Sequence, residues 1–318
     1  MLSRTADNLF WLARYVERAD YLSRVVEVTR RMASLPRPDG GEMTEWKSAL
    51  ISSGAHEAFH ALELEPTDEA IIEFLTYDPR NPSSIRNCLE MARTNARSVR
   101  TALTIEAWDA VNSGWLALRR FDERYRDDGP LDPEMLTQFL DHVKRVAVIF
   151  EGSAYRTMLR KDTYFFSRLG LNIERADNTA RILDVKYHVL LPQDERVGGS
   201  LDYYQWTSVL RAVSAVTAYH WVYRESVKPW LVADLLILRP ELPRSLIGCY
   251  ETIAQFLDLL GKAYGRQGLA QRQARQLHTR LQQARIEQIF QGGLHEFITE
   301  FIDENNRIGA RIAEQYLM

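Results

Sequence analysis

Two separate stretches of this chain carry nearly the same sequence: residues 12–20 read LARYVERAD and residues 169–177 read LGLNIERAD. In both stretches apolar residues recur at the spacing of one face of an α-helix. Both also place a Glu-Arg pair within that apolar pattern, at Glu17-Arg18 and at Glu174-Arg175. The pattern predicts two long helices that each carry charged side chains into the interior.

The similarity continues downstream of both stretches in the same order. Residues 46–60 match residues 206–220 at Trp, Leu, Ala and His positions. Residues 74–88 match residues 235–249 at Leu, Pro, Ser and Cys positions. Ordered matches of this kind indicate an internal duplication.

The fold class that these patterns predict is all-α, because no segment alternates convincingly between polar and apolar residues as a half-buried strand does. We expect two tandem helical repeats, residues 1–157 and 158–318, related by a pseudo-twofold axis and packed into one compact bundle with a shared core. A Pro- and Gly-rich loop is expected at residues 36–41. The expected helices cover residues 5–34, 44–63, 68–77, 83–103, 105–126, 132–158, 163–190, 201–226, 229–238, 244–265, 268–291 and 293–316.

The two cysteines, Cys88 and Cys249, occupy the same position of the repeat, early in a helix that follows a Pro-x-Ser turn. A serine of the turn at residues 81–84 (Asn-Pro-Ser-Ser) is expected to cap the helix that carries Cys88. Two cysteines make neither a disulfide framework nor a metal cluster. We therefore predict that both thiols are small buried packing groups.

Composition narrows the class of protein. The 318 residues carry a formal net charge of −3, which disfavours general nucleic-acid binding because such proteins usually carry a basic excess. The longest apolar stretch, residues 230–238, contains Asp234 and is too short to span a bilayer, so we expect no membrane partner. The charged N-terminal residues lack the apolar region of a secretion signal. These features predict a cytoplasmic protein.

The Glu-Arg pairs are the leading candidate site. A buried charge is costly unless it is paired and hydrogen-bonded, so each Glu is expected to meet an arginine of a facing helix. A small residue lies four positions before each Glu, at Ala13 and at Gly170, where it lets a neighbouring helix approach. The arginines considered as partners are Arg18, Arg24, Arg175 and Arg181.

Two interpretations of this cluster remain open. In the first, the charged groups form a closed structural network. In the second, they converge on a pocket, because arginine forks suit a carboxylate or phosphate ligand. The residues of that pocket would be Glu17, Arg18, Glu174 and Arg175.

A second candidate site is the sequence His56-Glu57-Ala58-Phe59-His60, which fits the zinc motif HExxH. On a helix the two histidines share a face, and the Glu could activate a metal-bound water. The repeat partner of His56 is Val216, so position 56 is expected to face the core. No third ligand follows at a familiar spacing, which disfavours a zinc site.

The ordered set of motifs resembles the bacterial Alpha-E family, which is named for its helical content and its Glu-Arg motif. The matching residues are Glu17-Arg18, 81–85 (NPSSI), 95–97 (NAR) and 243–245 (PRS). Members are encoded beside, or fused to, circularly permuted ATP-grasp amidoligases and transglutaminase-like peptidases. The resemblance therefore implies a partner of one of these two kinds and a role in making or processing a peptide-like amide. It supplies no catalytic residues.

Three functions from different classes remain. The favoured one is a non-catalytic accessory or binding protein of an amidoligase pathway, with no cofactor. The alternatives are a zinc-dependent hydrolase at His56, Glu57 and His60, and a binder or catalyst acting on a carboxylate or phosphate at the Glu-Arg cluster. Whether the chain is an enzyme stays open, although the sequence favours a protein that is not.

Overall fold

The structure is a computed structural model that describes residues 2–34, 45–188 and 200–317. Every regular element within these ranges is helical, which confirms the all-α prediction. The loop expected at residues 36–41 lies outside the described residues. The helices are α1 (Ser3–Ala33), α2 (Glu45–Ser52), α3 (His56–His60), α4 (Asp68–Thr76), α5 (Ile85–Ser98), η1 (Arg100–Ala102), α6 (Ile105–Ala117), α7 (Arg119–Asp128), α8 (Pro133–Thr157), α9 (Asp162–His188), α10 (Ser200–Ala212), α11 (Val216–Tyr223), α12 (Pro229–Leu238), α13 (Leu246–Ala263), α14 (Leu269–Gln283), α15 (Ile286–Gly292), α16 (Leu294–Ile312) and η2 (Ala313–Leu317).

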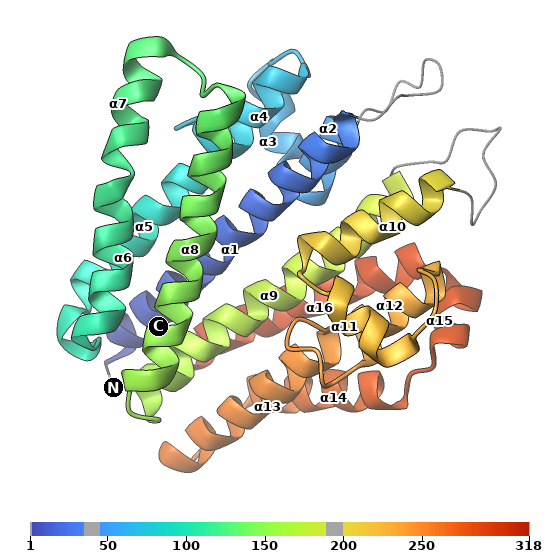
Figure 1. Ribbon diagram of the computed structural model, residues 1–318. Helices are drawn as coiled ribbons and strands as arrows, with labels where there is room; N and C mark the ends of the chain where they lie inside the picture. The colour runs from blue at the N-terminus through green and yellow to red at the C-terminus, as the bar shows by residue number, and fades with distance from the viewer. Residues whose placement is uncertain (1, 35–44, 189–199, 318) are drawn as a thin grey trace.

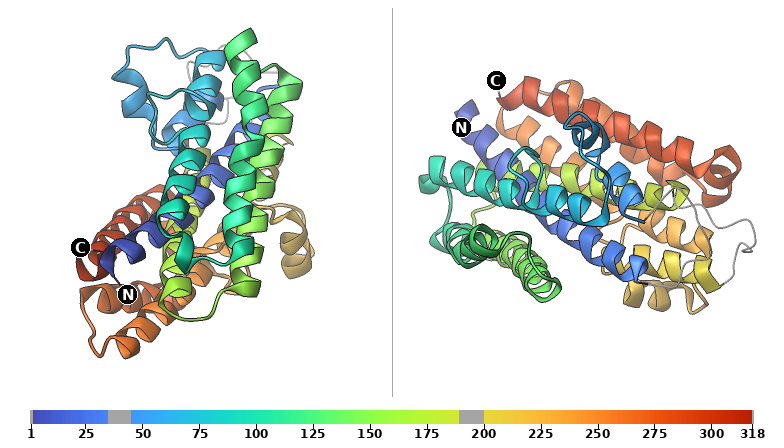
Figure 2. Two further views of the ribbon diagram at one scale, coloured as in Figure 1. Left: turned by 90° about the vertical axis from the view of Figure 1, so that its left-hand side faces the viewer. Right: turned by 90° about the horizontal axis from the view of Figure 1, so that it is seen from above.

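The longest helices, α1 and α9, pack against each other along the middle of the molecule (Figure 1). Helices α5 and α8 also pack on α1, whereas α13 and α16 pack on α9. The π-helical turn η2 packs on α1 as well, so the two ends of the described chain lie close together (Figure 2). The two stretches that carry the Glu-Arg pairs therefore face each other at the centre of the fold.

Close approach of α1 and α9 depends on small side chains between them. Ala13 on α1 and Ala176 on α9 are fully buried. A Cβ atom placed on Gly170 would overlap the carbonyl oxygen of Phe10. The backbones of the two helices thus touch at Gly170, as the small residue before the Glu predicted.

Several helices predicted as single elements are broken. The helix expected over 44–63 ends at Ser52 and α3 begins at His56, because Gly54 adopts a left-handed φ of 70°. The helix expected over 201–226 breaks in the same way at Ser214, whose φ is 58°. A residue in this conformation ends a helix. The helices expected over 83–103, 105–126 and 268–291 are also each divided in two.

The turns before α5 and α13 agree with the sequence prediction. Ser84 accepts a hydrogen bond from the Asn87 amide as the N-cap of α5, and Ser245 accepts one from Gly248 as the N-cap of α13. Cys88 and Cys249 follow and are both fully buried free thiols. Burial raises the pKa of each thiol to about 12. Both side chains therefore pack as neutral groups, which confirms the predicted role.

One cluster of buried apolar side chains contains residues from both halves of the sequence, including Phe10, Phe139, Phe166 and Tyr250. None of the helices in the described ranges combines the length and the apolar character that a membrane span needs. The shared apolar cluster and the contacts of α1 and α9 show that the interior is built mainly from helix-on-helix contacts around these two helices.

The contact at Gly170 makes a testable prediction. Gly170→Ala should destabilise the protein by about 1–3 kcal/mol, since the added methyl group must push α1 away from α9. Gly152→Ala on α8 is the matched control, because nothing lies within 4 Å of a Cβ at that position. The control should be neutral or stabilising, since Ala favours a helix more than Gly. Urea unfolding of both variants measures the difference, and equal stabilities would contradict the close contact.

Candidate functional site

Glu17 on α1 and Glu174 on α9 are buried carboxylates, with only 3% and 2% of their surfaces exposed. Each binds the arginine of the other motif. Arg175 donates to Glu17 through Nε (3.0 Å) and Nη2 (2.9 Å). Arg18 donates to Glu174 through Nε (2.6 Å) and Nη2 (3.2 Å). Across the α1–α9 contact, the Glu of each motif therefore pairs with the Arg of the other motif.

Each glutamate has a second arginine. Arg244, in the turn between α12 and α13, donates through Nη1 to Oε1 of Glu17 at 2.7 Å. Arg14, one turn before Arg18 on α1, donates through Nε to Oε2 of Glu174 at 2.7 Å. Both carboxylates thus receive three hydrogen bonds from guanidinium groups, the arrangement that compensates the cost of burial.

The pairing fixes the protonation state of both glutamates. Burial by itself would raise the pKa of Glu17, but the charges and hydrogen bonds of Arg175 and Arg244 outweigh burial and lower it to about 2. Burial likewise opposes ionisation of Glu174, while Arg18 and Arg14 lower its pKa to about 2. Neither carboxyl group is a suitable proton donor or base near neutral pH, since general acid–base catalysts titrate near the working pH.

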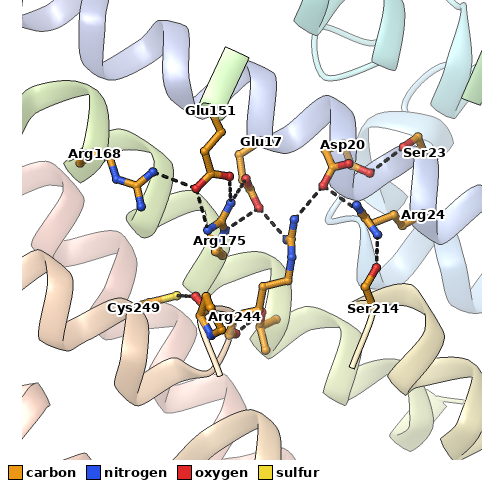
Figure 3. A network of polar contacts seen from close by, with 12 residues as sticks. Glu17, Asp20, Ser23, Arg24, Glu151, Arg168, Arg175, Ser214, Arg244 and Cys249 are labelled. Carbon is orange, nitrogen blue, oxygen red and sulfur yellow. Dashed lines mark hydrogen bonds and ion pairs between the residues drawn. The ribbon is translucent and has the colours of Figure 1, made fainter. Parts of the chain in front are cut away.

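The Glu17 side of the network extends to Glu151 on α8 and to Arg244 in the turn between α12 and α13 (Figure 3). Arg175 also binds Glu151 Oε2 at 2.8 Å, and Arg168 binds Glu151 Oε1 at 2.8 Å. Arg244 donates through Nη2 to Asp20 Oδ2 at 2.9 Å. The guanidinium of Arg244 thus bridges Glu17 and Asp20 and closes this side.

Arg24 and Arg181 do not bind the motif glutamates, which corrects that part of the sequence prediction. Each pairs instead with an aspartate four residues earlier on its own helix. Arg24 Nε lies 2.9 Å from Asp20 Oδ2, and Arg181 Nε lies 2.6 Å from Asp177 Oδ2. Residues four apart on a helix are neighbours, so the local acid outcompetes the distant one.

The Glu174 side of the network borders a cavity with a volume of about 160 Å³. The side chains of Arg18 and Arg181 line it and are 23% and 25% exposed, so the cavity reaches solvent. Its other polar lining residues are Tyr21, Ser53, Asn81, Ser83, Glu174, Asp177 and Asn178. Of the motif residues, Arg18 and Glu174 therefore border open space, whereas Glu17 and Arg175 are enclosed by their partners.

The histidine motif lies elsewhere, on the one-turn helix α3. His56, Glu57 and His60 are exposed, and the two imidazole rings lie with centroids 4.3 Å apart. The expectation that position 56 faces the core is wrong. Within the part of the chain that the structure describes, no three His, Cys, Asp or Glu side chains are grouped so as to hold a metal ion. A zinc hydrolase therefore gains no support from the geometry.

A family model described as a predicted alpha-helical domain with a conserved ER motif, named Alpha-E, matches residues 1–317. This chain belongs to the Alpha-E family. Uncharacterized proteins of Mycobacterium bovis and of Mycobacterium tuberculosis are each 28% identical to it over 117 residues. That match covers 33% of this chain and 13% of each relative. No solved structure matches the chain.

Sequence reasoning about this Alpha-E protein missed four residues of the site. Arg14, Glu151 and Arg168 sit on predicted helices without any repeat partner that would single them out. Asp20 had a signal, because the same aspartate recurs at Asp177. A fifth residue, Arg244, was recognised only as part of a family motif.

Removing one partner of the buried network should be costly. Glu17→Gln removes the buried charge that Arg175 and Arg244 both contact, so the free energy of unfolding of the Alpha-E protein should fall by about 3 kcal/mol or more. Glu27→Gln is the control, because Glu27 pairs with Arg31 and Lys144 at a more exposed site. That change should cost less than about 1 kcal/mol. Chemical denaturation measures both, and similar losses would show that burial adds nothing.

Stability of the Alpha-E protein should also depend on acid. The pKa values of Glu17 and Glu174 fall on folding, so their contribution is complete above pH 4.5 and is lost as pH decreases toward 2. Each carboxyl contributes about 3 kcal/mol that disappears across this range. Urea unfolding between pH 7 and pH 3 measures the decrease, and Glu17→Gln should reduce its slope. An unchanged slope would contradict the depressed pKa of Glu17.

Proposed function

We propose that this Alpha-E protein is a non-catalytic accessory or binding protein of a cytoplasmic peptide-modification pathway. Its partner would be a circularly permuted ATP-grasp amidoligase or a transglutaminase-like protein. The observation that carries the non-catalytic part is the pairing of Glu17 and Glu174 with two arginines each. A motif whose carboxylates are paired with arginines and ionised suits the assembly of a scaffold better than the transfer of protons.

The proposal includes the division of the chain into two related repeats, residues 1–157 and 158–318. Three parallels support it. The Glu-Arg partners are exchanged reciprocally, Ser84 and Ser245 cap corresponding helices, and the helices after each repeat's first long helix break at Gly54 and at Ser214. A pseudo-twofold axis near the α1–α9 contact would relate these features.

The lengths of the relatives favour a modular role. The matched segment is only 13% of each mycobacterial protein, so those chains contain much sequence besides it. Gene neighbourhoods of the family, with their amidoligases and transglutaminase-like peptidases, supply the choice of partner. Binding, rather than catalysis, is also favoured by the cavity beside Arg18, which is open although the neighbouring carboxylates are paired with arginines.

Co-expression with a circularly permuted ATP-grasp amidoligase from the same genome tests the proposal. The two proteins should co-elute on size-exclusion chromatography, and omission of this chain should reduce ligase activity or stability. Glu17→Gln, assayed at a temperature where it is folded, should support the ligase as the unaltered chain does. A ligase that is equally active and stable alone would overturn the partnership, and loss of activity with folded Glu17→Gln would overturn the non-catalytic assignment.

A further inference from the structure

The cavity beside Glu174 lies where, on the Glu17 side of the α1–α9 contact, the side chain of Arg244 fills the corresponding space. Residues 82–84 read Pro-Ser-Ser where residues 243–245 read Pro-Arg-Ser. Arg244 extends from the second turn to bridge Glu17 and Asp20. Ser83 extends from the first turn only far enough to bind Arg18 Nη1 at 3.1 Å. The shorter side chain leaves open the space that a guanidinium fills in the second turn.

A second difference concerns the arginine that follows each motif. Arg24 Nη1 donates to the hydroxyl of Ser214 at 2.7 Å. The corresponding residue beside Arg181 is Gly54, which has no side chain, and a Cβ atom placed on it would lie 3.0 Å from Arg181 Nη1. In the described ranges Arg181 therefore makes a hydrogen bond through Nε alone, and both of its terminal nitrogens remain available as donors.

The groups that line the cavity include both unused donors and partly used acceptors. Asn178 is buried, and its Nδ2 has no hydrogen-bond acceptor among the described residues. Asp177 receives one hydrogen bond from an arginine, whereas its counterpart Asp20 receives two. Glu174 Oε1, which also borders the cavity, receives one. A ligand that fits must therefore present an acceptor to Arg181 and an N–H donor to the acids.

The charge around the cavity indicates the charge of that acceptor. The ion-paired groups on this side are three arginines and two acids, which leave one positive charge in excess. A single carboxylate neutralises it and matches the planar fork of a guanidinium. A doubly charged phosphate would be repelled by the nearby carboxylates. The ion-paired residues are Arg14, Arg18, Arg181, Glu174 and Asp177.

We propose that this cavity binds the α-carboxylate and the adjacent N–H group of an amino acid or of a peptide's C-terminal residue. Arg181 and Asn178 hold the carboxylate, while Asp177 and Glu174 accept the N–H. At about 30 Å³ per water in the liquid, the 160 Å³ cavity corresponds to roughly five waters, which is room for a small residue. The inference rests on the proposed binding role and names the chemistry of what is bound.

Titration calorimetry with small probes tests this site. L-alanine represents the free amino acid, N-acetyl-L-alanine represents the peptide end, and N-acetyl-L-alaninamide lacks the carboxylate. At least one of the two carboxylates should bind, the better one identifying the source, and the amide should not. Absence of binding by both carboxylates, equal binding of the amide, or tighter binding of inorganic phosphate would overturn the proposal.

Two variants locate the binding. Arg181→Gln should weaken the carboxylate probe by about tenfold or more, the usual effect of losing a hydrogen bond to a charged group. Arg24→Gln is the matched control, because Arg24 makes the same i,i+4 pair with its aspartate but does not line the cavity. It should leave probe affinity unchanged. An equal loss in both variants would overturn the assignment to this cavity.

Ser83→Arg tests the cavity by filling it. The new side chain should bridge Glu174 and Asp177 as Arg244 bridges their counterparts, abolish probe binding and keep the chain folded. If this variant does not fold, Arg181→Gln decides.

The two proposals can fail separately. If the chain binds a probe but does not associate with the amidoligase, the cavity is supported and only the proposed partner is overturned. Association without probe binding overturns the cavity alone.

Discussion

The fold depends on the exchange of partners between two Glu-Arg motifs. Glu17 and Arg18 are neighbours in sequence, and adjacent residues on a helix point in different directions, so they cannot satisfy each other. Each finds its counterpart on the opposite helix, Glu17 with Arg175 and Arg18 with Glu174. Burying such groups is unfavourable until the second helix arrives. The motif therefore requires α1 and α9 to pack in one relative position.

The same exchange explains why a charged interior coexists with close packing. Backbones touch at Gly170 and Phe10, which brings the side chains within hydrogen-bond distance and keeps water away from them. Arginine suits this setting because its planar fork donates several directed hydrogen bonds and stays charged. One difference between the two sides of the network is the side chain that comes from the turn before α5 or α13. Arg244 closes one side, and Ser83 leaves the other open to solvent.

Much of the fold could be predicted from the sequence. Apolar periodicity located α1 and α9, and the Pro-x-Ser turns located the cap at Ser84 and the starts of α5 and α13. The buried charges pointed to cross-helix pairs. The breaks at Gly54 and Ser214 were missed because a single left-handed residue leaves no mark on an otherwise helical pattern. Ser214 in particular is not a residue type that signals such a turn.

The composition of the site was harder to predict than the existence of its pairs. Arg24 and Arg181 were natural candidates, but aspartates one turn earlier hold them. Glu151 and Arg244 reach the network from α8 and from a turn, and spacing along α1 or α9 says nothing about them. The arginine that pairs with a buried acid depends on which side chains the other helices and turns bring near it, and helical periodicity does not show this. The same placement of neighbouring side chains decides which side of the α1–α9 contact stays open.

The reciprocal pairing has a consequence for the order in which the chain is made. Helix α1 emerges from the ribosome long before Arg175, and the Glu and Arg of its motif have no charged partners of the other motif until α9 follows. At about 5–20 residues per second, translation separates the two events by roughly ten to thirty seconds. During that interval the first half holds Glu17 without Arg175, so the centre of the molecule closes only as the second half is synthesised.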